Sequence, residues 1–202
     1  GGASPPVGAD CKKKHEKNII SRLCTGLGMA KSDPFLIRAQ ITMSHTGQAA
    51  VQTEIDLGSY TNLGSSKPEI LRIHKLDFMV TDSTQDYPTV NQNATAALSW
   101  QLCTSGNSGA LVSPVDDSFV AGAAITMRNN DGNGARQPSE AIEQNVMPQD
   151  YVGGYPVAVP SLFLTGFVDE DFAEDITVTI LLQCSTESLS KANAVALAIS
   201  QQ

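Results

Sequence analysis

The chain has 202 residues, of which 41% are hydrophobic, so it can form one large β domain with a sizeable core, and global disorder is excluded. Its net charge of −8 argues against nucleic acid as the main partner, because the phosphate backbone calls for a basic face. Only 17% of the residues are charged, which suits a secreted β protein or one that buries surface against copies of itself.

A Gly- and Pro-rich arm, residues 1–10, opens the chain and is followed by the basic stretch CKKKHEK. Such a stretch can contact nucleic acid or an anionic membrane surface, although a solvated first helical turn explains the same charges. The candidate contact residues are Lys12, Lys13, Lys14 and Lys17. Helical spacing then predicts a short helix built on Ile19, Ile20, Leu23 and Leu27. Residues 1–32 are therefore interpreted as an arm with a short helix.

From Asp33 onward the apolar residues recur with a period of two, which predicts β-strands separated by Gly- and Asn-rich turns. The predicted strand segments are 33–43, 49–57, 69–80, 95–104, 118–127, 155–167 and 174–184. In segment 69–80 the alternation breaks, so we expect its buried face to change midway. The single tryptophan, Trp100, falls within the alternation of segment 95–104, which favours a place in the core.

The last segment predicts a helix at about 186–200, capped by Ser185 or Thr186. Its apolar residues fall on one stripe: Leu189, Ala192, Val195, Ala196 and Ile199. Strands and helices do not alternate along the chain, which argues against a parallel sheet. The predicted fold class is all-β: an antiparallel β-sandwich over residues 33–202, a single jelly roll with a short N-terminal helix and a C-terminal helix.

None of the four cysteines forms a C-x-x-C pair or has a histidine at zinc-ligand spacing, so a structural zinc site is not expected. Cys103 and Cys184 each end an apolar segment. They can pair as a disulfide or remain as buried free thiols, and the sequence leaves both possibilities open.

The stretch GNSGA, Gly106 to Ala110, resembles the nucleophile region of chymotrypsin-like serine proteases. That resemblance implies Ser108 as a nucleophile beside an oxyanion hole. However, Ala110 replaces the usual second glycine, and His45 and His74 precede the serine too closely for that family's two barrels. We therefore interpret SGNSG as a hairpin turn and keep a serine hydrolase only as a minor alternative.

The stretch NNDGNGARQPSE has the ligand spacing of a twelve-residue calcium loop. The candidate metal ligands are Asn129, Asp131, Asn133 and Glu140. Asn at the first position, Arg136 inside the loop and a strand pattern upstream exclude an EF-hand. The remaining alternatives are a weak calcium site, with calcium as the only cofactor candidate, and an ordinary turn between strands, which is favoured.

The basic arm and the strand segments VQTEIDL, EILRIHKLDFMV and ITVTILLQC together resemble a small viral coat protein with a single jelly roll. This resemblance implies a non-enzymatic capsid subunit, located in the virion, that assembles with copies of itself into an icosahedral shell. It also implies contacts of the arm with other capsid proteins, the genome or an internal membrane, and no small-molecule substrate. The alternative is a carbohydrate-binding or adhesin module, which would be extracellular.

Overall fold

The computed structural model describes residues 32–47 and 49–201. In this part of the chain nine strands are followed by one α-helix. The strands are β1 (Phe35–Met43), β2 (Val51–Asp56), β3 (Glu69–Thr81), β4 (Thr95–Cys103), β5 (Phe119–Arg128), β6 (Glu140–Val146), β7 (Tyr155–Val157), β8 (Ser161–Val168) and β9 (Ile176–Ser188). The helices are the short 3-10 helix η1 (Pro148–Asp150) and α2 (Lys191–Ser200). Apart from Ser32, the predicted arm and short helix lie outside the described residues.

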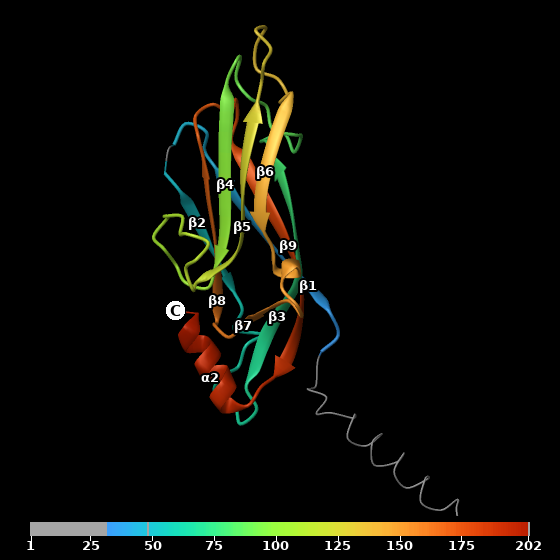
Figure 1. Ribbon diagram of the computed structural model, residues 1–202, viewed down its shortest axis with the longest axis vertical. Helices are drawn as coiled ribbons and strands as arrows, with labels where there is room; N and C mark the ends of the chain where they lie inside the picture. The colour runs from blue at the N-terminus through green and yellow to red at the C-terminus, as the bar shows by residue number, and fades with distance from the viewer. Residues whose placement is uncertain (1–31, 48, 202) are drawn as a thin grey trace, which may run out of the picture. The chain divides into compact units, whose positions relative to one another are not determined.

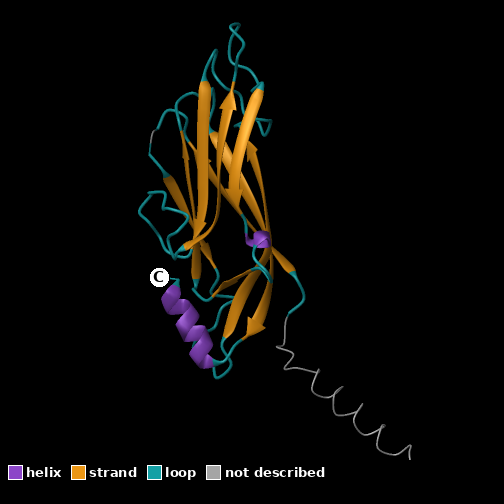
Figure 2. Ribbon diagram, viewed as in Figure 1, coloured by secondary structure: helices purple, strands orange, loops and turns teal. Residues whose placement is uncertain are grey.

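Two antiparallel sheets form the layers of a sandwich (Figures 1 and 2). One sheet has the strand order β1-β9-β3-β7, and the other has the order β2-β8-β4-β5-β6. Figure 1 shows β4, β5 and β6 toward the viewer. The predicted all-β sandwich with a C-terminal helix is confirmed.

The strand pairing identifies the sandwich as a jelly roll. If β6 is set aside, the first strand pairs with the last (β1 with β9) and the second with the seventh (β2 with β8). The third then pairs with the sixth (β3 with β7), and the fourth with the fifth (β4 with β5). These four antiparallel pairs form the nested arrangement of a jelly roll. Pairing of β3 with β9 joins two of the pairs into the first sheet, and pairing of β4 with β8 joins the other two into the second sheet. This is the predicted single jelly roll, extended by β6 at one edge.

Apolar side chains that point inward from both sheets form one continuous core. The predicted inward residues of β9 are all fully buried: Ile176, Val178, Ile180 and Leu182. Trp100 is also fully buried, and its ring centroid lies 5.0 Å from that of Phe78. The tryptophan therefore packs two sheets together and is not available as an exposed platform for a sugar.

The predicted change of buried face occurs within β3. The pairing of β3 with β9 shifts register between Ile73 and Lys75, so that His74 is an extra residue in β3. Before the shift Leu71 and Ile73 point inward, and after it Leu76 does. A β-bulge of this kind restores an apolar inner face where strict alternation would have buried Lys75.

Two strand predictions differ from the structure. The predicted segment 155–167 is two strands, β7 and β8, which belong to different sheets and are separated at residues 158–160. The strand β6 is absent from the predictions, so the described residues form nine strands where seven or eight were expected. Its sequence EAIEQNV has weak β propensity and every residue is exposed, so pairing with β5 is what stabilises it.

The C-terminal helix differs from its prediction in both start and orientation. The strand β9 continues to Ser188, so α2 begins at Lys191, and the cap is Ser190, whose side chain accepts a hydrogen bond from the Asn193 N–H. The helix buries Ala194 and packs Leu197 and Ala198 on the body, next to Ile70 and Ala158. The predicted stripe therefore faces solvent over most of its length: Ala192, Val195, Ala196 and Ile199 are exposed.

Cys103 and Cys184 are buried free thiols. Burial, with a smaller effect of the Asp116 carboxylate, raises the pKa of Cys103 to about 11, and burial raises the pKa of Cys184 to about 12. At pH 8 roughly one Cys103 thiol in a thousand is then ionised, so both should resist alkylation in the native protein. Mass spectrometry after a short iodoacetamide pulse should find both unmodified, and both labelled once urea unfolds the chain. Fast native labelling of either thiol would contradict this burial.

Candidate functional site

Three loops meet at one end of the sandwich: 82–94 between β3 and β4, 129–139 between β5 and β6, and 169–175 between β8 and β9. Val90 lies at their centre, because it forms β-bridges with both Arg136 and Phe172. The Val90 N–H donates to the Arg136 carbonyl at 2.9 Å, and the Arg136 N–H donates back at 3.0 Å. The Asn91 N–H donates to the Asp171 carbonyl at 2.9 Å. Backbone pairing therefore joins the loops into one unit.

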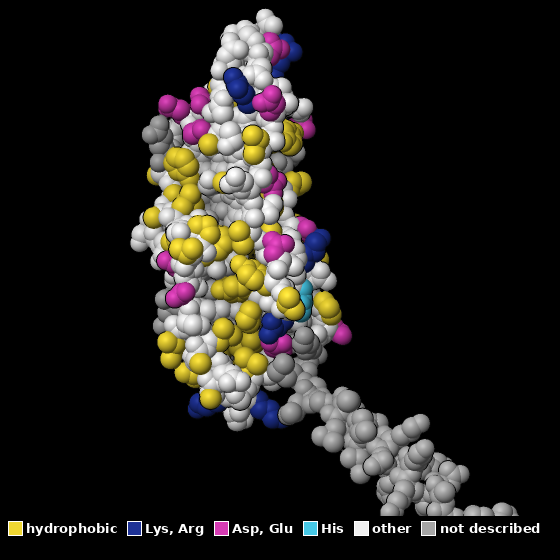
Figure 3. All heavy atoms as spheres, in the orientation of Figure 1, with side chains coloured by type: hydrophobic (Ala, Val, Ile, Leu, Met, Phe, Trp, Pro, Cys, Tyr) yellow, Lys and Arg dark blue, Asp and Glu magenta, His cyan; other side chains and the backbone are white. Residues whose placement is uncertain are grey.

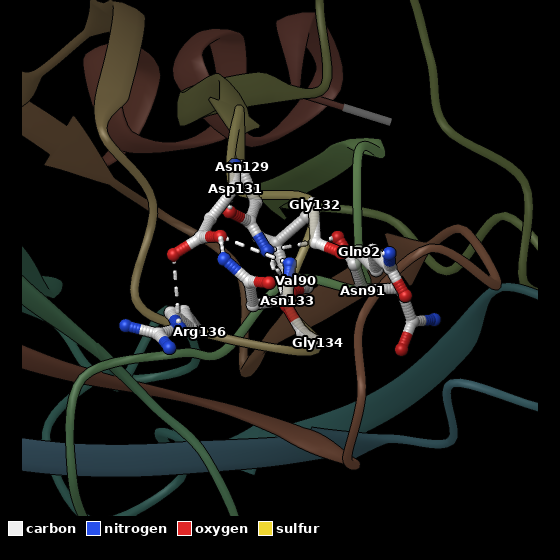
Figure 4. A network of polar contacts seen from close by, with 9 residues as sticks. All are labelled: Val90, Asn91, Gln92, Asn129, Asp131, Gly132, Asn133, Gly134 and Arg136. Carbon is white, nitrogen blue, oxygen red and sulfur yellow. Dashed lines mark hydrogen bonds and ion pairs between the residues drawn. The ribbon is translucent and has the colours of Figure 1, made fainter.

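Asn129, the first residue of the candidate calcium loop, is buried in this unit with 2% of its surface exposed. Its side-chain N–H2 group donates to three carbonyl oxygens: those of Val90 at 3.0 Å, Asn91 at 3.1 Å and Gly134 at 3.0 Å. Figure 4 shows this amide pointing to the loop 82–94 on one side and to Gly134 on the other. Asn129 thus acts as a hydrogen-bond donor that fastens two loops together.

The oxygens of the candidate loop are used mainly by the loop itself. The Asn129 side-chain oxygen accepts from the Asp131 N–H at 2.9 Å. One Asp131 carboxylate oxygen accepts from the Asn133 N–H at 2.9 Å and from its side-chain amide at 2.8 Å. The other carboxylate oxygen pairs with Arg136 Nε at 3.1 Å (Figure 4). These bonds form successive Asx turns, which order a Gly- and Asn-rich loop through its own polar groups.

The structure brings three of the four candidate ligands together and places the fourth in a strand. Asn129, Asp131 and Asn133 lie in one hydrogen-bonded loop, whereas Glu140 begins β6, opposite Arg128 of β5. Within residues 32–47 and 49–201 no three His, Cys, Asp or Glu side chains gather into a group that could hold a metal ion. Calcium binding by Asn129, Asp131, Asn133 and Glu140 stays a prediction.

Carboxylates at this end of the sandwich serve loop structure, and their pKa values reflect that. Burial works against ionisation of Asp82, but hydrogen bonds from Thr84 and from the Asp86 N–H outweigh it and lower the pKa of Asp82. Hydrogen bonds from the ring and the backbone N–H of His45 lower the pKa of Asp175. Burial raises the pKa of Asp169 despite its hydrogen bond from the Ala97 N–H.

Ser108 lies in the loop 104–118, which connects the paired antiparallel strands β4 and β5. SGNSG therefore belongs to a hairpin connection, as predicted, but that connection is a long loop and not a short turn. Ser108 adopts a φ of 51° and is exposed, within a turn closed by a hydrogen bond from the Ala110 N–H to the Asn107 carbonyl. The His45 ring lies 2.8 Å from an Asp175 carboxylate oxygen, and the His74 ring lies 2.8 Å from the Ser185 hydroxyl. The structure therefore gives the two histidines other partners than Ser108.

The candidate contact residues Lys12, Lys13, Lys14 and Lys17 lie outside the described residues. No helix in the described part of the chain has the length and apolar character needed to cross a membrane.

A buried ion pair at the other end of the first sheet was not evident in the sequence. Arg72 of β3 donates from Nε to the Glu187 carboxylate of β9 at 2.9 Å and forms a second, ionic contact with the same oxygen. The Glu187 side chain is 1% exposed and that of Arg72 is 19% exposed. The guanidinium also donates to the carbonyls of Gly153 and Gly154 at 3.2 and 3.3 Å. Arg72 thereby joins two strands to the loop that leads into β7.

A pocket of about 390 Å³ opens on the outer face of β4, β5 and β6 and was likewise not predicted. Its floor is formed by small outward-facing residues of adjacent strands: Ser99, Gly122 and Ala124. Leu111 and Pro114 of the loop 104–118 form one wall, with Phe119 beside them, and β6 forms the other. The sequence signal is the small residue type at outward positions, which becomes visible only once the register is known.

The strand pairing defines the class of this protein as a single jelly roll. No family model and no curated protein matches the sequence. Among solved structures, the chain is similar to VP1 of Trichodysplasia spinulosa-associated polyomavirus in complex with 3'-sialyllactose. The identity is 8% and the TM-score 0.40, over 81% of this chain and 99% of that chain.

Two further similar structures come from other viruses. Desmodium yellow mottle tymovirus matches with 13% identity and a TM-score of 0.27 over 93% of each chain. Human norovirus GI.7 Houston strain, a VLP in T=3 symmetry, matches with 11% identity and a TM-score of 0.35. That match covers 93% of this chain and 37% of the other. The assignment of the jelly roll to this chain rests on its own strand order.

Proposed function

We propose that the protein is a structural capsid subunit, located in the virion, that assembles with copies of itself into an icosahedral shell. The jelly roll suits this role, because it is one of the folds from which shells are built. The basic residues Lys12, Lys13, Lys14 and Lys17 are proposed to contact the genome or an internal membrane, and the arm to contact other capsid proteins. For the loop 129–140 the two alternatives are a weak calcium site that orders the loop and an ordinary turn between strands, and we favour the turn.

The observation that carries the proposal is a group of exposed apolar side chains at and beside the edge strand β6. All seven residues of the edge strand β6 are exposed, and Ile142 is 67% and Val146 36% exposed. Val115 in the neighbouring loop is 88% exposed. The edge is charged by Glu140 and Glu143, so the apolar side chains are what supports the proposal. Monomeric proteins keep exposed apolar patches small, and this surface therefore fits a protein that buries it against another chain.

Particle size tests the proposal. Light scattering and electron microscopy of the purified protein should find species far larger than the 21.3 kDa chain, increasing with protein concentration. A parallel series with a calcium chelator separates calcium-bridged contacts, which would dissociate, from contacts made by protein alone, which would persist. A chain that stays monomeric across concentration, salt and calcium would contradict the proposed function.

A further inference from the structure

The helix α2 is apolar on two sides, and only one of them is used within the chain. Ala194 is fully buried, whereas on the opposite side Val195 is 42% and Ile199 69% exposed. Of the ten residues of α2, all described, Lys191 alone is charged. The apolar side of a helix normally packs against another element, so the side bearing Val195 and Ile199 lacks a partner within the described chain.

The pocket on β4, β5 and β6 is the matching hollow. None of its lining residues is charged. Gly122 has no side chain and therefore leaves the floor of the pocket open. A larger residue does not fit at this position, because its Cβ would lie 2.8 Å from the Trp100 carbonyl oxygen. Its loop wall is held in place, since the Gln101 side chain donates to the Val112 carbonyl at 2.6 Å and accepts from the Val112 N–H at 2.8 Å. The hollow is therefore neutral and already formed.

The helix and the pocket belong to one face of the molecule. The Gln201 carbonyl at the end of α2 accepts a hydrogen bond from the Thr104 hydroxyl at 2.6 Å, and Thr104 begins the loop that walls the pocket. Figure 3 shows hydrophobic side chains gathered on this side, both over the middle of the sheet and over the helix at the lower end. The face thus carries an apolar protrusion and an apolar hollow together.

We propose that this face binds the same face of a second copy around a two-fold axis, with Ile199 and Val195 of each α2 inserted in the pocket of the other copy. A two-fold contact requires a self-complementary surface, and a protrusion beside a hollow meets that requirement. The net charge of −8 makes two copies repel each other, so a face with a neutral hollow and an almost uncharged helix is where they can approach. At the rim, Lys191 complements Asp116 and Asp117 of the partner's loop.

This contact rests on the proposed self-assembly and names the surface that makes it. The test uses two single variants of the full chain, Ile199→Glu and Ala124→Arg, in sedimentation velocity. Each should lose the two-fold dimer, with self-association weakened at least about 30-fold, the size of a hot-spot loss. Mixed in equal amounts, the two variants should dimerise. In the mixture the new carboxylate on the helix of one copy meets the new guanidinium in the pocket of the other, and the second contact keeps its wild-type form.

A Val152→Glu variant is the matched control, because Val152 is an apolar, fully exposed residue in the loop between η1 and β7, a strand of the other sheet. It should associate like the wild type. Circular dichroism checks that each variant is folded, and Val195→Glu replaces Ile199→Glu if the latter is not. Variants that associate like the wild type, or a mixture that stays monomeric, would overturn the two-fold contact and leave the proposed function standing. A wild-type chain that never associates would remove the proposed function itself.

Discussion

Replacing Asn129 by aspartate is expected to lower the free energy of unfolding by at least about 3 kcal/mol, roughly 1 kcal/mol for each carbonyl that loses its donor. The two side chains have almost the same shape, but aspartate cannot donate. Its carboxylate would lie against the oxygens of Val90, Asn91 and Gly134, which the amide now contacts at 3.0 to 3.1 Å. Because Asn129 is buried, water cannot replace the lost bonds. Urea unfolding at pH 7 measures the loss.

The same substitution separates the two interpretations of the loop. In a calcium loop aspartate is the usual first ligand, so Asn129→Asp should strengthen calcium binding, and calcium should stabilise the variant. In a loop held by the amide, the variant is destabilised and millimolar calcium does not rescue it. Unfolding curves with calcium and with a chelator distinguish these results. We expect no rescue.

Asn130→Asp provides the control. Asn130 is the next residue, it is exposed, and its amide donates only one hydrogen bond that the structure records, to the Ser139 hydroxyl at 3.1 Å. The change in charge and shape is the same, so the expected loss is below about 1 kcal/mol. Equal losses at the two positions would contradict the role of Asn129 as the buried donor.

This loop shows why sequence spacing did not determine its role. Calcium loops and Asx turns use oxygen-bearing side chains at the same short intervals, so Asn129, Asp131 and Asn133 satisfy both patterns. What distinguishes them is the orientation of the Asn129 amide, which depends on Val90 and Asn91, residues 39 and 38 positions earlier in the chain. Single-sequence reasoning has no access to that long-range pairing.

Strands that bury one face in the core could be predicted from the sequence, because burial requires apolar residues at alternate positions. A strand that buries neither face could not. Alternation in β9 and the change of face in β3 follow from the core, so the sequence records them. The strand β6 buries nothing, and its residues carry no alternation to read. The helix α2 has apolar residues on two sides, so the stripe through Val195 and Ile199 looked like its inner face. Contact with Ile70 and Ala158 selects the side bearing Ala194 instead.

The Arg72→Met variant is expected to lose about 3–5 kcal/mol of the free energy of unfolding, because it leaves the buried Glu187 carboxylate without its cation. Methionine keeps the apolar stem of the side chain, so the loss reports mainly on the charge and its hydrogen bonds. The carbonyls of Gly153 and Gly154 lose a donor as well. The loop that leads into β7 should then open more often, and amide exchange should become faster at Gly154, Tyr155 and Val157.

A double variant and a variant of an exposed ion pair test whether the loss of stability in Arg72→Met arises because Glu187 is buried. Replacing both partners, Arg72→Met with Glu187→Leu, should recover most of the loss, since no buried charge is left. Lys75→Met in the same strand removes the cation of the pair with Asp77, whose side chains are 52% and 58% exposed. That control should cost less than about 1 kcal/mol, because water and salt screen an exposed pair. An equal loss in the free energy of unfolding for Arg72→Met and Lys75→Met would show that the ion pair does not link β3, β9 and the loop before β7. The apolar cluster of Ile70, Ala158 and Ala194 would then be what stabilises that end of the sheet.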